Sequence, residues 1–160
     1  MATMITGGAG FIGACLAKLL IDEGDKPVIF DIAPVQGPLS EHSDRFVFEQ
    51  GKGQRRIRDR KTNETWQLTE LAPDGKTPED YAIVSRLVDS ATGQVIVSAA
   101  GITQYGTRAA GELLTDEELL AAALAKVPPG WQDRKLQILL QAKVYKGIPA
   151  APTVLAVDAW

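Results

Sequence analysis

The sequence has very few of the side chains that build disulfides and metal centres. Among its 160 residues there is one cysteine, Cys15, and one histidine, His42. A single cysteine excludes an intrachain disulfide, and we interpret Cys15 as a small apolar residue on a helix. One histidine with one distant cysteine does not make a metal site. We therefore expect no bound metal.

Long hydrophobic runs and a strong basic charge are missing too. No apolar run approaches the roughly 18 residues of a membrane span. The N-terminus also lacks the basic-then-apolar order of a signal peptide. The net charge of −3 argues against a protein whose whole surface binds nucleic acid. We expect a soluble cytoplasmic protein without a membrane or nucleic-acid partner, and the sequence leaves any protein partner open.

The segment from Thr6 to Gly13 is the most informative stretch that is present. It reads Thr-Gly-Gly-Ala-Gly-Phe-Ile-Gly and lies between an apolar run, residues 2–5, and a helix-like segment, residues 11–23. Gly7 allows a tight turn after the strand, Gly10 lets backbone N–H groups approach a pyrophosphate, and Gly13 lets the helix pack closely. The phosphates would lie at the helix N-terminus, where free N–H groups favour negative charge.

An acidic residue completes this pattern. Asp31 follows a second predicted strand, residues 27–30, where its carboxylate would meet the hydroxyl groups of a ribose. A carboxylate at this position favours NAD over NADP, because the extra phosphate of NADP would be repelled. An ordinary strand, turn and helix without a ligand is the alternative interpretation.

Residues 1–51 closely resemble the start of the NAD-dependent epimerase/dehydratases, which are extended short-chain dehydrogenase/reductases. The resemblance rests on the segment Thr6–Gly13, the strand that ends in Asp31, and a third strand, residues 46–49. It implies that Gly7, Gly10, Phe11, Ile12, Gly13 and Asp31 bind NAD. In that family the third strand is usually followed by Gly-Asp, whereas this chain has Gly51-Lys52.

The family's catalytic pair cannot be assigned in this chain. Its members use a tyrosine and a lysine four residues later, which lowers the tyrosine pKa for proton exchange. The residues four positions after Tyr81, Tyr105 and Tyr145 are Ser85, Ala109 and Pro149. We therefore expect NAD binding without the family's catalysis.

The rest of the chain predicts hairpins and two helices. Strands are expected over residues 55–60 and 65–69, joined at Thr62-Asn63, and over residues 81–88 and 94–99. Helices are expected over residues 104–114 and from a capping box, Thr115 to Glu118, to residue 126. Two closing strands are expected over residues 135–145 and 153–160. The predicted fold is an α/β N-terminal Rossmann-like βαβ segment, residues 1–51, joined to an α+β domain with antiparallel hairpins, residues 52–160.

The second part is similar to an uncharacterised C-terminal domain found in some bacterial proteins, several of which carry a predicted helix-turn-helix ahead of it. The similarity implies no known activity. Its strongest segments are Ile57–Arg60, Asp80–Val84, Ala99–Thr103, Gly106–Glu112 and Pro128–Trp131, together with the terminal Trp160.

Two further segments each allow two interpretations. The basic run from Lys52 to Lys61 could meet phosphates, but we favour an edge strand with solvated charges. The segment from Ala100 to Thr107 follows a strand and precedes a helix, so its N–H groups could hold an anion. More often such glycines simply allow the turn and close packing.

Three hypotheses about function follow. The first is an NAD-binding protein related to epimerase/dehydratases that lacks their chemistry. The second is a non-enzymatic regulatory or binding domain, in which the glycine-rich segment contributes only a strand and a helix. The third is a chimeric chain with no single evolved function, suggested by the abrupt break at Gly51-Lys52.

Overall fold

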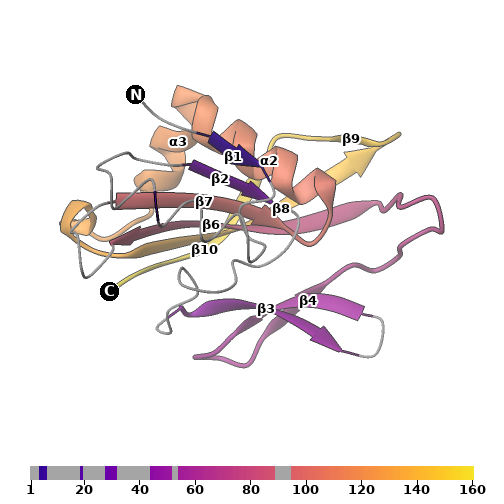
Figure 1. Cartoon of the computed structure of the whole chain (residues 1–160), viewed down its shortest axis with the longest axis horizontal. Coiled ribbons are helices and arrows are strands. Elements are labelled where there is room, and N and C mark those ends of the chain that lie inside the picture. The colour runs from indigo at the N-terminus through magenta and orange to yellow at the C-terminus, as the bar shows by residue number, and fades with distance from the viewer. Residues whose placement is uncertain (1–3, 7–18, 20–27, 32–43, 52–53, 89–94) are drawn as a thin grey trace.

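The large sheet of the computed structural model joins strands from both ends of the chain (Figure 1). The structure describes residues 4–6, 19, 28–31, 44–51, 54–88 and 95–160. Within these residues the sheet has seven strands, in the order β1 (Met4–Thr6), β2 (Val28–Asp31), β7 (Val95–Gly101), β6 (Glu79–Val88), β8 (Leu136–Tyr145) and β10 (Thr153–Ala159), with β9 (Ile148–Pro149) beside β8. β1, β2 and β7 are parallel, and the remaining pairs are antiparallel.

A smaller sheet and two helices lie on opposite faces of the large sheet (Figure 1). The small sheet contains β3 (Phe46–Gly51), β4 (Gln54–Asp59) and β5 (Thr65–Gln67), which pair antiparallel in that order. The helices are α2 (Gln104–Thr115) and α3 (Glu117–Leu124), and a short 3₁₀ turn, Trp131–Asp133, precedes β8. The two sheets together form a curled half-barrel.

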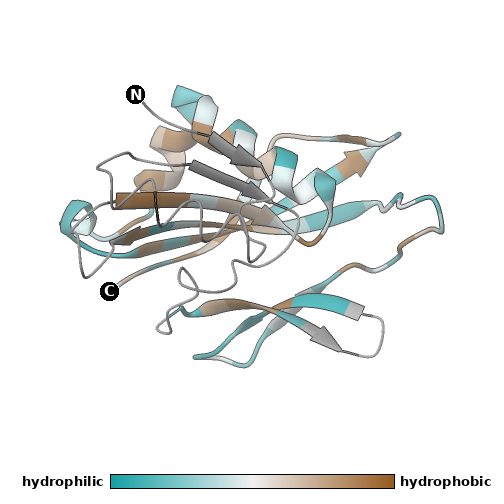
Figure 2. Cartoon of the chain, in the orientation of Figure 1, coloured by the Kyte–Doolittle hydropathy of each residue, from teal (hydrophilic) through white to brown (hydrophobic). Residues whose placement is uncertain are grey.

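Within the described residues, two buried clusters fill the spaces between these layers. Alternate residues of β8 divide between them, since Leu136, Ile138 and Leu140 pack toward the helices while Leu139 packs toward the small sheet. A strand covered on both faces is continuously apolar, which explains the run of hydrophobic residues in β8. In Figure 2, hydrophobic residues run along β7 of the large sheet.

The predicted fold class is wrong. β1 and β2 do not form a Rossmann-like βαβ segment joined to a separate α+β domain, because β2 pairs directly with β7 of the later chain. The expected third parallel strand, residues 46–49, is β3, which pairs antiparallel with β4 in the other sheet. The physical reason is the alternation of inward and outward side chains along β3. Phe46 and Phe48 face the core, while Glu49 lies on the outer face and pairs with Arg56. This pattern is typical of an antiparallel sheet with one solvated face.

Most later elements are confirmed with small changes at their ends. β6 and β7 form the expected hairpin partners, as do β4 and β5. Asn63 adopts a positive φ of 63° in the turn between β4 and β5, a conformation that asparagine tolerates better than most residues. The predicted helix over residues 11–23 lies outside the described residues, apart from Leu19.

The small sheet is fixed to the large sheet by polar contacts as well as apolar ones. The buried Gln137 side chain of β8 accepts a hydrogen bond from the Phe46 N–H at 2.9 Å and donates one to the Phe46 carbonyl at 3.0 Å. Arg45 binds both carboxylate oxygens of Asp59 and also approaches Asp158 of β10. These contacts satisfy buried polar groups that would otherwise destabilise the interface.

None of the helices in the described part of the chain is long and apolar enough to cross a membrane.

Candidate functional site

The carboxyl ends of three parallel strands share one edge of the large sheet. Thr6 is the last residue of β1 and pairs with Phe30, and Asp31 ends β2 opposite Ala100 of β7. The residues that follow β1 and β7 therefore begin at this same edge. Of the predicted NAD-binding residues, Gly7, Gly10, Phe11, Ile12 and Gly13 lie outside the described residues, as does His42. Asp31 occupies the expected strand end.

The N-terminus of α2 holds an anion from the chain itself. The fully buried Asp80 carboxylate of β6 accepts hydrogen bonds from the Thr103 N–H at 3.1 Å and the Gly106 N–H at 2.6 Å, and from the Thr103 hydroxyl. Burial raises the pKa of Asp80, and these hydrogen bonds oppose the rise. The Asp80 carboxylate therefore accepts hydrogen bonds from N–H groups of the segment that we considered as an anion-binding turn.

Close packing at this turn explains its two glycines. A Cβ on Gly101 would lie 2.3 Å from the Thr107 nitrogen, and a Cβ on Gly106 would lie 2.6 Å from the Tyr81 carbonyl oxygen. Both contacts involve backbone, so neither can be relieved by moving a flexible side chain. Asp80 was not singled out from the sequence as a capping group. The available signal was a carboxylate at the start of an apolar strand, whose hairpin partner leads into a glycine-containing turn.

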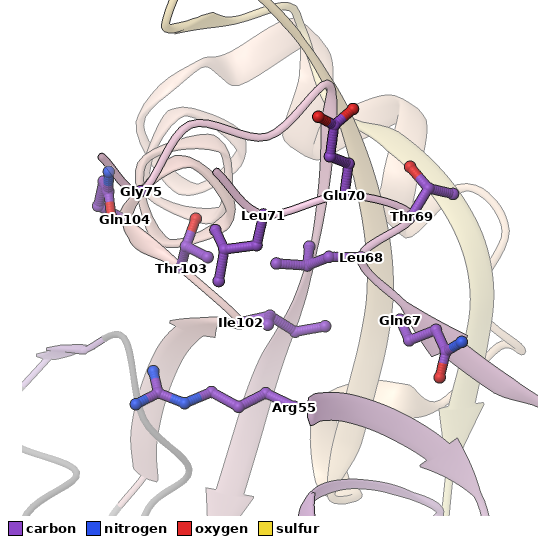
Figure 3. Close-up of a pocket in the computed structure, with 10 residues that line it drawn as sticks. All are labelled: Arg55, Gln67, Leu68, Thr69, Glu70, Leu71, Gly75, Ile102, Thr103 and Gln104. Carbon is purple, nitrogen blue, oxygen red and sulfur yellow. The ribbon is translucent and has the colours of Figure 1, made fainter. Parts of the chain in front are cut away.

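A pocket of about 520 Å³ opens beside this turn (Figure 3). One wall comes from β4, β5 and the following loop, and the other comes from the turn between β7 and α2. The lining residues are Arg55, Gln67, Leu68, Thr69, Glu70, Leu71, Gly75, Ile102, Thr103 and Gln104. Sequence analysis missed this site because the two walls are separated by some thirty residues and carry no recognisable motif.

The basic run identified in the sequence divides into paired and unpaired side chains. Arg56 and Arg58 both bind Glu49 on the outer face of the small sheet, and Lys61 binds Asp158 at 2.6 Å. Arg58 is the main reason why the pKa of Glu49 is lowered. The expected edge strand is wrong, because β4 is the middle strand of its sheet. Arg55 points toward the pocket instead (Figure 3).

A polar cluster lies beside the small sheet and includes a tyrosine and a lysine. Gln141 donates hydrogen bonds to Glu79 at 2.8 Å and to the Tyr81 hydroxyl at 3.2 Å, and Lys143 donates to Glu79 at 2.8 Å. Burial raises the pKa of Tyr81, and the Glu79 charge raises it further. This environment opposes a reactive phenolate, unlike the tyrosine and lysine pair of the epimerase/dehydratases.

Among the described residues, no group of three histidine, cysteine, aspartate or glutamate side chains could hold a metal ion.

Comparison with known proteins gave no match to any family model, to any curated protein or to any solved structure.

Proposed function

We propose that this chain binds NAD through Gly7–Gly13 and Asp31 without carrying out an epimerase/dehydratase reaction. The observation that supports the proposal is the parallel pairing of β1 with β2. It puts the start of the glycine-rich segment and Asp31 at one edge of the sheet, as dinucleotide binding requires. This strand arrangement supports the proposal, even though the sheet around it is not the one expected.

Each predicted residue has a separate role in this proposal. Gly7 allows the chain to turn, Gly10 admits the pyrophosphate close to backbone N–H groups, and Gly13 lets the following helix pack. Phe11 and Ile12 contribute backbone N–H groups to the same turn. Asp31 accepts hydrogen bonds from ribose hydroxyls and disfavours the additional phosphate of NADP. The bound cofactor would supply hydride-transfer chemistry, for which we assign no catalytic partner.

Thermal unfolding in the presence of NAD tests this proposal. We expect millimolar NAD to raise the melting temperature in a concentration-dependent manner, and NADP to raise it less. Gly10→Val and Asp31→Ala should each abolish the shift. Asp25→Ala, which removes a carboxylate from the same segment, should leave it intact. If millimolar NAD produces no shift with the unmodified chain, the proposal is wrong.

A non-enzymatic binding domain is the second candidate, and the pocket between β5 and the β7–α2 turn favours it. On this hypothesis the glycine-rich segment only contributes structure, so ligand binding should survive Gly10→Val. Loss of all ligand binding in that variant would contradict it. For either function we propose a cytoplasmic location, supported by the lone cysteine.

A further inference from the structure

The pocket beside the β7–α2 turn has the size of a small-molecule site. Its volume of about 520 Å³ lies within the range of about 300–1,000 Å³ that is usual for ligand pockets. One wall is well packed, since Ile102 is 1% exposed, whereas the other wall includes the exposed loop residues Glu70 and Leu71. None of the described residues that line the pocket belongs to the glycine-rich segment.

The centre of the pocket is apolar. Figure 3 shows Ile102 between Arg55 on one side and Leu68 and Leu71 on the other. Leu71 is 56% exposed and directly precedes a turn that is closed by the hydrogen bond from the Ala72 N–H to the Lys76 carbonyl. A ligand with a hydrophobic body would cover this leucine and remove apolar surface from water.

The pocket also presents one positive charge. Within the described residues Arg55 has no ion pair, whereas Arg45, Arg56 and Arg58 all bind carboxylates. A guanidinium group matches a carboxylate through two parallel hydrogen bonds. The neighbouring helix N-terminus does not compete for the anion, because the Asp80 carboxylate already occupies it.

The other charged residue of the pocket limits the charge of the ligand that can bind beside Arg55. Glu70 lines the same pocket and would repel a ligand with several negative charges, such as a nucleoside polyphosphate. The amide groups of Gln67 and Gln104 offer neutral hydrogen-bonding partners. A ligand with one negative charge fits this set better than a polyphosphate.

We propose that this pocket binds a small monocarboxylic acid with an aromatic or branched aliphatic body. The carboxylate pairs with the Arg55 guanidinium, and the apolar body lies among Leu68, Leu71 and Ile102. The described lining of this site shares no residue with the proposed NAD site.

Binding of 3-phenylpropionate to the full chain tests the proposal, with the uncharged 3-phenylpropionamide as the matched ligand. Calorimetry should give a dissociation constant below 1 mM for the carboxylate and at least tenfold weaker binding for the amide. Arg55→Gln should weaken carboxylate binding at least tenfold, because a charge-assisted bidentate contact is lost. Arg56→Gln is the control, since Arg56 lies on the outer face, and it should leave the affinity unchanged.

Three outcomes would overturn the proposal. They are the absence of binding by the unmodified chain at 10 mM carboxylate, equal affinity for the amide and the carboxylate, and unchanged carboxylate affinity in Arg55→Gln. Gly10→Val separates this test from the NAD test, because it should abolish the NAD shift and leave carboxylate binding intact. Displacement of the carboxylate by AMP but not by other monocarboxylates would assign the pocket to a nucleotide instead.

Discussion

At the scale of single residues, an ion pair joins the residue before β3 to the end of β4 within the small sheet. Asp59 is almost fully buried at the end of β4 and binds Arg45 through both carboxylate oxygens, with a shortest distance of 2.7 Å. The hydrogen bond from Arg45 is the main cause that lowers the Asp59 pKa to about 2, against the opposing effect of burial. The Lys61 N–H adds a further hydrogen bond of 2.7 Å. The ionised form of Asp59 is therefore part of the folded structure.

This arrangement predicts a loss of stability in acid. The folded-state pKa of Asp59 lies below its ordinary value of 3.8, so its contribution is present above pH 3.8 and is lost as the pH falls toward 2. We expect the free energy of unfolding to fall by about 2 kcal/mol over this window from Asp59 alone. Urea unfolding at several pH values measures it.

Two variants separate the contribution of Asp59 to the acid dependence of stability from the contributions of other carboxylates. Asp59→Asn should lower stability at neutral pH and flatten the dependence between pH 4 and pH 2. Asp74→Asn is the control, because Asp74 is exposed and pairs only with Lys76, an arrangement that contributes little to stability. An Asp59→Asn variant that keeps the full acid dependence would contradict this assignment.

At the scale of elements, one residue joins the two helices. The Asp116 N–H closes α2 by donating to the Glu112 carbonyl at 2.9 Å. The Asp116 side chain caps α3 by accepting hydrogen bonds from the Glu118 and Leu119 N–H groups at 3.0 Å each. The predicted cap at Thr115 is therefore wrong by one residue. Thr115 still belongs to α2, where its hydroxyl donates to the Gly111 carbonyl.

A pair of alanine substitutions distinguishes the two residues. Asp116→Ala should lower the free energy of unfolding by about 1 kcal/mol, because two N–H groups of α3 lose their acceptor. Thr115→Ala should cost less than about 0.5 kcal/mol, since it removes only a hydroxyl bonded within α2. Chemical denaturation of both variants measures the difference. A larger effect at Thr115 would contradict this account of the cap.

Local patterns were enough to predict most elements but not the partners of the early strands. Alternation and turn residues predicted the β6–β7 pair, because both strands are adjacent in sequence and share a hairpin. The partner of β2 is β7, which no local pattern could indicate. For β3, the opposite charges of Glu49 and Arg56 were a usable signal for antiparallel pairing. The pocket required tertiary structure, because its walls meet only in the folded chain.

At the scale of the whole molecule, the described core belongs to the later part of the chain. Both buried clusters are formed by residues from Phe46 onward, including Ile57 and Leu139 on one side and Leu113 and Ile138 on the other. β1 and β2 extend the sheet beyond β7. The described part of the core is therefore contained in residues 44–160.

A truncated chain tests whether this part of the chain is independent of the rest. We expect residues 44–160 to fold alone and to unfold cooperatively, because both apolar clusters and the Arg45–Asp59 pair are retained. Circular dichroism and urea unfolding of the truncated and full chains measure the difference. If residues 1–43 add no stability, the hypothesis of a chimeric chain gains support, whereas failure of residues 44–160 to fold would contradict our expectation.

The parallel pairing of β2 with β7 also has a consequence for synthesis on the ribosome. Val28 lies opposite Val97, so β2 leaves the ribosome long before its partner has been translated. Until then β2 can pair with β1, but the backbone N–H and C=O groups that bind β7 have no partner strand. During this interval the side of β2 that faces β7 must remain unpaired or find a temporary partner, so slow translation before residue 101 should favour aggregation or the recruitment of chaperones.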